Sequence, residues 1–267
     1  MLKNFIRLPY VIYVTILFVV VILISFPITL ILMLFPNRIK DHGMFILLKA
    51  ISNLWFILIG FIAKNYHRSQ IDFSKSYIIM ANHQSFLDAA IVYTSIPQVF
   101  KSLGKKELEK APVYGIIYRS VVITVDRSSM TARAASLRKM KKELEEGNSM
   151  LIFPEGTFKD TAQTELLPFQ SGGFSLALMQ EVDILPVLFL DTPDRIHPSK
   201  LWVISPGFNR AVFLPSISHL AFDKKAGDQL KDFTQAYMQD CLDFCRKHSP
   251  KDVWEFATHW QATHLQT

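Results

Sequence analysis

The chain has 267 residues, of which 50% are hydrophobic, and a formal net charge of +6. This length allows one domain with a full core and an appended segment. Residues 1–68 hold seven lysines or arginines and one acidic residue, whereas the rest of the chain holds 22 of each sign. Because the excess positive charge is confined to this first segment, a nucleic-acid-binding protein is not expected.

An apolar segment opens the chain. Residues 8–37 contain no charged side chain over 30 positions, and a helix needs only about 20 to cross a bilayer core. The segment lacks the short apolar region and cleavage site of a secretory signal, so we expect a retained membrane element. Residues 44–63 form a second apolar run, interrupted only by Lys49. The two runs are either two spans or a re-entrant hairpin in one leaflet.

Residues 1–68 are therefore predicted to be an N-terminal membrane anchor of one or two hydrophobic helices, and residues 69–267 a globular domain. The basic residues that flank the apolar runs favour the cytoplasmic face of the membrane for this domain. Both alternatives for the anchor return the chain to the side on which it started.

After the anchor, short apolar runs alternate with helical patterns. Helices are predicted at 85–93 and 131–146, the second with apolar residues at helical spacing and Gly147 placed to end it. We expect an α/β fold, a sheet covered by helices and preceded by the hydrophobic helical anchor. The predicted strands are 77–80, 150–153, 185–190, 201–205 and 211–214.

A late helical pattern carries both cysteines, Cys241 and Cys245. They are four residues apart on its apolar stripe. Small core residues explain this spacing better than a metal or redox pair does.

Two predicted strands end in polar loops. The run YIIM leads into NHQSFLD, residues 82–88, and MLIF leads into PEGT, residues 154–157. Open α/β sheets bind ligands at the carboxyl ends of their strands. We therefore expect His83 and Glu155 to be neighbours although they lie 72 residues apart in the sequence.

The loop NHQSFLD has two interpretations. Ser85 and Asp88 have the spacing of a helix capping box, which explains the carboxylate without catalysis. Alternatively, Asp88 accepts a hydrogen bond from one ring nitrogen of His83, and the other nitrogen takes a proton from a substrate hydroxyl. In both cases we expect Asn82, Ser85 and Asp88 to build the start of a helix.

The second loop and the segment between the loops contain candidate anion-binding groups. PEGT is either a turn with a surface glutamate or a turn whose Gly156 and Thr157 amides face an anion or a hydroxyl. Residues 98–142 hold eleven basic and three acidic residues, in part on the solvated face of the predicted helix. Lys105 and Arg127 lie outside that helix and are better placed to hold a phosphate.

Four segments of the chain resemble a known family. NHQSFLD, GKKELEKAPVYGIIYRSVVITVDR, LIFPEGT and ILPVLF resemble, in this order, the four blocks of the 1-acyl-sn-glycerol-3-phosphate acyltransferases, over residues 77–190. The resemblance implies a membrane-bound enzyme that transfers a fatty acyl group to a lysophospholipid hydroxyl and produces phosphatidic acid. It implies acyl-CoA or acyl-carrier protein as the donor substrate, and no metal, other cofactor or covalent enzyme intermediate.

The resemblance also implies roles for individual residues. His83 would be the general base and Asp88 its orienting partner, while Pro186 belongs to the fourth block, which is structural or binds the acyl chain. The positions implied for the acceptor are Lys105, Gly115, Arg127, Glu155, Gly156 and Thr157.

Two departures from the family pattern leave the acceptor open. The family often has FPEGTRS, but Phe158 stands here in place of the arginine. A lysine is common in a stretch such as PFKKGAF, where this chain has Gln170 and Ser171. Acceptors with another head group, such as an amino-acid lipid or lysophosphatidylglycerol, are therefore alternatives to lysophosphatidic acid. A membrane-tethered binding module and a thioester hydrolase are further alternatives.

Overall fold

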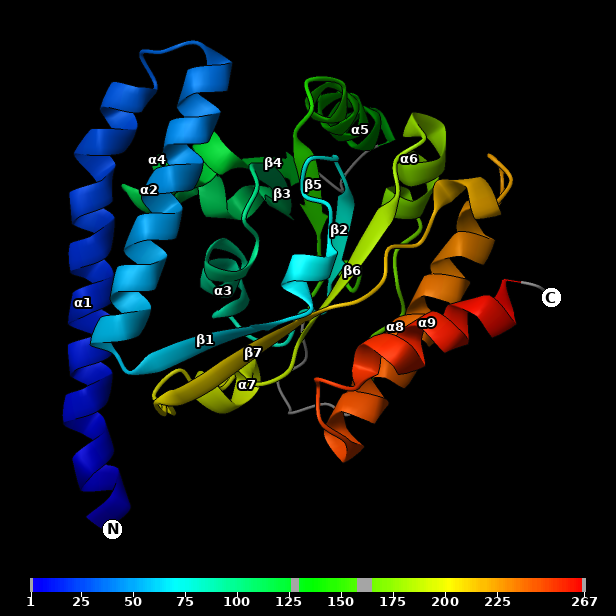
Figure 1. Cartoon of the computed structure of the whole chain (residues 1–267). Helices are drawn as coiled ribbons and strands as arrows, with labels where there is room; N and C mark the ends of the chain where they lie inside the picture. Colours follow the sequence, from blue (N-terminus) through cyan, green and yellow to red (C-terminus); the bar gives the residue numbers. More distant parts are fainter. Residues whose placement is uncertain (1, 126–129, 158–164, 266–267) are drawn as a thin grey trace.

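The structure is a computed structural model that describes residues 2–125, 130–157 and 165–265, without the side chains of 2–7 and 130–133. These residues form a seven-stranded sheet in the order β1-β7-β6-β2-β5-β3-β4 (Figure 1). Neighbouring strands are parallel except for β6 and β7. The strands are β1 Phe61–Tyr66, β2 Ile78–Ala81, β3 Phe100–Lys105, β4 Val122–Val125, β5 Ser149–Ile152, β6 Ile184–Phe189 and β7 Gly207–Phe213.

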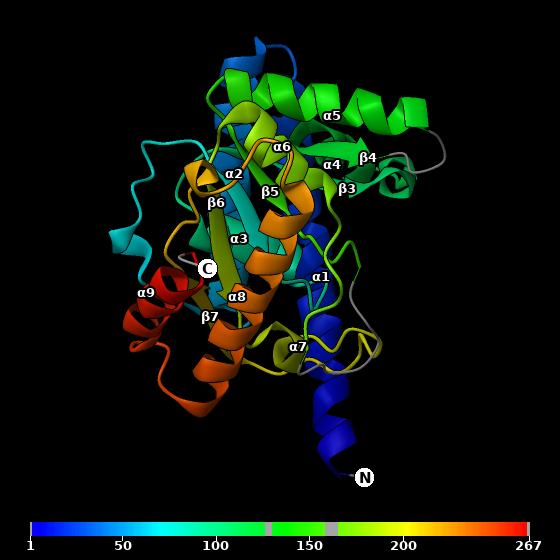
Figure 2. The same cartoon turned by 90° about the vertical axis from the view of Figure 1, so that its right-hand side faces the viewer.

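Helices cover both faces of the sheet, so the predicted α/β class is confirmed. One layer contains α1 (Leu2–Leu32), α2 (Asn37–Leu58), α3 (Asp88–Ser95) and α4 (Tyr114–Val121). The other contains α5 (Met130–Glu145), α6 (Gly172–Gln180), α8 (Gly227–Lys247) and α9 (Val253–His264); Figure 2 shows α8 and α9 in front and α1 behind. The short α7 (Thr192–Arg195) follows β6.

The central strand β2 shows why the apolar runs become buried strands. Ile79 and Ala81 belong to the core under the first helical layer, and Ile78 and Met80 to the core under the second. A parallel strand covered on both faces reads as a continuous apolar run, and all four of these residues are buried. The same pattern accounts for β5 and β6, where the predicted strands are also confirmed.

Some predicted elements differ from the observed ones. Strands β1, β3 and β4 were not predicted, because β1 and β3 contain lysines and β4 is a short run beside a helix. The predicted strand 201–205 is wrong, since only Ile204 makes an isolated bridge, to Ile196. The prediction that the cysteines are core residues is confirmed: both are buried free thiols in α8, and burial raises the pKa of Cys245 to about 12.

The first two helices form an antiparallel hairpin that is part of the folded unit (Figure 1). Both are long and apolar enough to cross a membrane. However, α2 packs Met44, Phe45 and Phe56 into the core of the sheet, and β1 pairs with β7. The predicted boundary at residue 68 therefore does not follow the fold: the apolar run 44–63 is a half-buried helix followed by an edge strand.

A buried ion pair joins this hairpin to the sheet. Lys101, in β3, places Nζ 2.7 Å from Oδ1 of Asp41, in α2, and 2.9 Å from the carbonyl oxygen of Ser120. Both charged side chains are less than a tenth exposed. A buried charge needs such partners, because removing one leaves the other desolvated without compensation.

We expect Lys101→Met to lower the free energy of unfolding by about 3 kcal/mol, because the buried Asp41 carboxylate loses its hydrogen-bonded lysine and keeps the more distant Lys40, at 3.7 Å. For a chain of this size the melting temperature should fall by about 6 to 12 °C, measured by a thermal melt in detergent. Lys75→Met is the matched control, since it removes the lysine of an exposed pair. Equal melting temperatures for the two variants would contradict the assigned role, and Asp41→Leu combined with Lys101→Met should recover part of the loss.

Candidate functional site

A histidine and a carboxylate meet where the loop after β2 enters α3. His83 Nδ1 lies 2.8 Å from Oδ2 of Asp88. The backbone amides of Gln84 and Ser85 donate to the same oxygen, at 2.7 and 2.9 Å. The Asp88 side chain is fully buried, whereas that of His83 is 21% exposed. One buried carboxylate therefore holds both the loop and the orientation of the ring.

The two interpretations of Asp88 are both partly correct. Its bond to the Ser85 amide is one half of a capping box. The other half is absent, because the Ser85 hydroxyl donates to the carbonyl oxygen of Ile196, at 2.6 Å, and the Asp88 amide donates to the carbonyl oxygen of Ser85. As a result α3 begins at Asp88, three residues later than the predicted helix.

Asn82 does not build the helix start, so that prediction is wrong. Its side-chain amide donates to the carbonyl oxygen of Phe189, at 2.9 Å, and its Oδ1 accepts from the Phe189 amide, at 2.7 Å. An amide side chain carries both a donor and an acceptor, so it satisfies both backbone groups of Phe189. Asn82 thus joins the ends of β2 and β6 beside the histidine.

Glu155 lies next to His83, as predicted, but it is not a surface residue. It is 6% exposed; Oε1 accepts from the backbone amide of His83 and Oε2 from that of Leu167, both at 2.8 Å. Burial raises the pKa of Glu155, and the two backbone hydrogen bonds act in the opposite direction. Glu155 therefore ties the loop after β5 to the histidine loop and to the segment before α6.

The turn around Glu155 uses its glycine internally. Gly156 has φ +69°, a conformation that favours glycine, and its amide donates to the carbonyl oxygen of Phe153 at 3.0 Å. The expectation that this amide faces a ligand is therefore not met, while Thr157 is exposed beyond the turn. The Phe153 ring stacks on the His83 ring, with centroids 4.3 Å apart. This contact was not predicted, because Phe153 ends an apolar run that reads as core.

Some of the other candidate residues lie at the same edge of the sheet. Lys105 is exposed at the end of β3, which is parallel to β5. A Cβ on Gly115, in α4, would collide with the backbone carbonyl of Glu109, so only glycine fits there. Arg127 and Phe158 lie outside the described residues. Ser171 donates to Asp228 Oδ1 at 2.6 Å and joins the start of α6 to α8.

The chemical capacity of the site follows from the histidine and carboxylate. A carboxylate that holds Nδ1 selects the tautomer with the proton on that nitrogen and stabilises the imidazolium. The base is partly exposed at the carboxyl edge of the sheet, where a ligand can approach it. This arrangement is suited to taking a proton from a bound hydroxyl.

Comparisons with known proteins point to the same chemistry. Residues 63–190 match the family model described as Acyltransferase. The chain is 29% identical to a 1-acyl-sn-glycerol-3-phosphate acyltransferase of Saccharomyces cerevisiae over 63% of this chain and 55% of that protein. It is 32% identical to a protein of the same name from Haemophilus influenzae, over 45% of this chain and 50% of that one.

The chain thus spans about half the length of the curated relatives it matches. Its fold is similar to the crystal structure of the 1-acyl-sn-glycerophosphate (LPA) acyltransferase PlsC from Thermotoga maritima. The TM-score is 0.77 at 19% identity, over 92% of this chain and 98% of that one. The resemblance in the four sequence blocks is confirmed, since residues 63–190 match the Acyltransferase family model.

Proposed function

We propose that the chain is a membrane-bound enzyme that transfers a fatty acyl group from a thioester to the hydroxyl of 1-acyl-sn-glycerol-3-phosphate and forms phosphatidic acid. The observation that carries this proposal is the contact of 2.8 Å between His83 and the buried Asp88 at the carboxyl edge of the sheet. The family match and the names of the relatives support it.

In the proposed reaction the acceptor's hydroxyl oxygen attacks the carbonyl carbon of the thioester while Nε2 of His83 takes the hydroxyl proton. The carbon–oxygen bond forms, the carbon–sulfur bond breaks, and the departing thiolate receives the proton from the imidazolium. Asp88 stabilises the imidazolium through Nδ1 during this exchange. His83 therefore returns to its initial state after each turnover.

The remaining residues are proposed to position the acceptor. Lys105 would hold its phosphate, because it ends β3 at the edge that carries His83, and the family resemblance assigns Arg127 the same role. Glu155 would act through His83, since its oxygens bind backbone amides, and Thr157 would face the acceptor. Gly115 would shape this region by letting α4 pack against the segment before it.

The hairpin of α1 and α2 is proposed to lie in one leaflet of the cytoplasmic face rather than to span the bilayer. A spanning α2 would draw the sheet into the bilayer, because one face of α2 packs on α3, α4 and β1. The hairpin exposes apolar side chains, including Leu34 in its turn and Ile57 in α2. This placement would bring both lipid substrates to the active site.

A different lysolipid acceptor is the second candidate. Phe158, Gln170 and Ser171 replace cations that often accompany the site in the family, and Ser171 is engaged with Asp228. Lysophosphatidylglycerol or an amino-acid lysolipid would then be preferred over lysophosphatidic acid. A thioester hydrolase would release thiol without any acceptor, and a binding module would release none.

We expect His83→Ala to reduce transfer by about 10²- to 10⁴-fold, the usual contribution of a general base. Thiol release and diacyl product are measured with detergent-purified protein, acyl-CoA or acyl-carrier protein as donor, and lysophosphatidic acid as acceptor. His259→Ala, which removes an exposed histidine of α9, is the matched control. Undiminished transfer by a folded His83→Ala protein would refute the mechanism.

Asp88→Asn separates the charge of the carboxylate from its hydrogen bonds. The asparagine carbonyl oxygen can accept the three bonds that Oδ2 accepts, so stability should fall by only about 1 kcal/mol. Asp88→Ala loses all three bonds and should cost about 3 kcal/mol in a thermal melt. Transfer should drop in both variants. Wild-type transfer by Asp88→Asn would show that the negative charge is not required.

Arg127→Ala tests the phosphate assignment. We expect the KM for lysophosphatidic acid to rise about tenfold or more, because a charge-assisted hydrogen bond is lost, while the KM for the donor stays constant. Arg119→Ala, at an exposed position of α4, is the control. A panel of lysolipids assayed in parallel identifies the preferred head group. A rise in the KM for the donor instead would refute the assignment of Arg127.

A further inference from the structure

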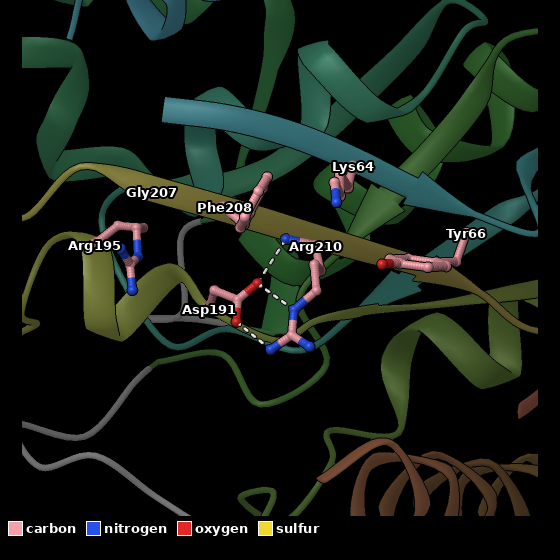
Figure 3. Close-up of a pocket in the computed structure, with 7 residues that line it drawn as sticks. All are labelled: Lys64, Tyr66, Asp191, Arg195, Gly207, Phe208 and Arg210. Carbon is pink, nitrogen blue, oxygen red and sulfur yellow. Dashed lines mark hydrogen bonds and ion pairs between the residues drawn. The ribbon is translucent and has the colours of Figure 1, made fainter. Parts of the chain in front are cut away.

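A second polar site lies on the strands β1 and β7 of the sheet. A cavity of about 380 Å³ opens on the strands β1 and β7, which β6 separates from β2 (Figure 3). Side chains alternate along these strands, so that Phe61 and Asn209 are buried while Lys64 and Phe208 are exposed. The cavity is lined by Lys64, Tyr66, Asp191, Arg195, Gly207, Phe208 and Arg210.

The cavity carries net positive charge. The guanidinium of Arg210 binds Asp191 through both carboxylate oxygens, at 2.8 and 2.6 Å, so the only carboxylate of the lining is neutralised (Figure 3). The two other basic residues of the lining are Lys64 and Arg195. Lys64 Nζ lies 4.1 Å from the centre of the Phe208 ring, and Arg195 donates to the carbonyl oxygen of Pro206. Neither forms an ion pair with any other residue that the structure describes.

Apolar and cationic groups follow one another along the strands. Ile62 is paired with Phe208, and Lys64 with Arg210, in the register of β1 and β7. Two residues along a strand correspond to about 6.6 Å, so Lys64 and Arg210 lie about that far along the strands from Ile62 and Phe208. Ile62 and Phe208 are about half exposed. The apolar pair is on the side of the hairpin, because β1 begins directly after α2.

The end of α2, just before β1, also exposes apolar side chains. Ile57 and Leu58, in its last turn, are 74% and 45% exposed. The hydroxyl groups of Tyr10 and Tyr13, in α1, donate to the carbonyl oxygens of Ile59 and Leu58. Tyrosines are common at the boundary between the hydrocarbon core and the head groups of a bilayer. Along the strands, Arg195 lies beside Pro206 and Gly207, before the apolar pair, and Lys64 lies beyond the pair.

We propose that this cavity binds the phosphate of an anionic phospholipid, with Lys64 and Arg195 at the phosphate and the acyl chains along Ile62 and Phe208. A phosphodiester with apolar chains matches both the charge and the adjoining apolar surface. The inference rests on the proposed membrane-bound function. The bound lipid would orient the domain on an anionic membrane and would not take part in the reaction at His83.

The test measures lipid retention by the full chain in neutral detergent micelles doped with phosphatidylglycerol or with phosphatidylcholine, by native mass spectrometry. We expect tighter retention of phosphatidylglycerol. Lys64→Gln should weaken it about fivefold, the usual effect of one lysine at an anionic surface. Lys225→Gln, an exposed lysine of the loop before α8, should leave it unchanged.

Binding is measured without a donor and also on His83→Ala, so failure of the proposed acyl transfer and failure of the lipid site give different results. Ile62→Gln should weaken retention of phosphatidylglycerol and leave any binding of inorganic phosphate unchanged. Equal retention of the two lipids, or no effect of Lys64→Gln, would overturn the proposal. Tighter binding of adenosine 3′,5′-bisphosphate than of phosphatidylglycerol would also overturn it and would assign the cavity to the nucleotide end of a donor.

Discussion

The loop that carries His83 depends on one oxygen atom, Oδ2 of Asp88. This atom accepts hydrogen bonds from the His83 ring and from two consecutive backbone amides. A buried carboxylate is costly unless it is hydrogen-bonded, so these three donors compensate for the burial of Oδ2, whereas Oδ1 has no hydrogen-bond partner among the described residues. The same bonds that compensate for burial also orient the imidazole. Asp88 therefore serves both the folded conformation of the loop and the orientation of the imidazole.

The strand order makes this arrangement possible. Because β2 lies between β5 and β6 and all three are parallel, their carboxyl ends meet at one edge. Asn82 then satisfies the backbone of Phe189 at the end of β6, and Glu155 reaches back from the end of β5 to the amide of His83. These side chains bind backbone groups at the ends of the strands, where the hydrogen bonds between strands stop. The segment that carries His83 is thus bonded to residues at the ends of both neighbouring strands.

The hairpin is built into this frame rather than attached to it. The pair Asp41 and Lys101 links α2 to β3, and β1 extends the sheet beside β7. A surface that contacts lipid through the hairpin therefore has a defined orientation relative to the histidine edge. The cationic cavity on β1 and β7 would add an electrostatic contact to the same orientation. In the proposed function, these elements would link lipid access to the histidine edge.

The sequence by itself determined the α/β class, the four central apolar strands, the candidate pair His83 and Asp88 and the proximity of Glu155, because these depend on local patterns and on the rule that parallel strands end together. It did not predict β1 and β3, whose lysines hide the strand pattern, the short strand β4, or the partners of Asn82 and Phe153. Only the tertiary structure decided that Glu155 is buried, that Asn82 bridges to β6 and that α2 is a core helix with an ion pair. Such contacts join residues far apart in the chain, and their energy comes from burial that no local pattern records.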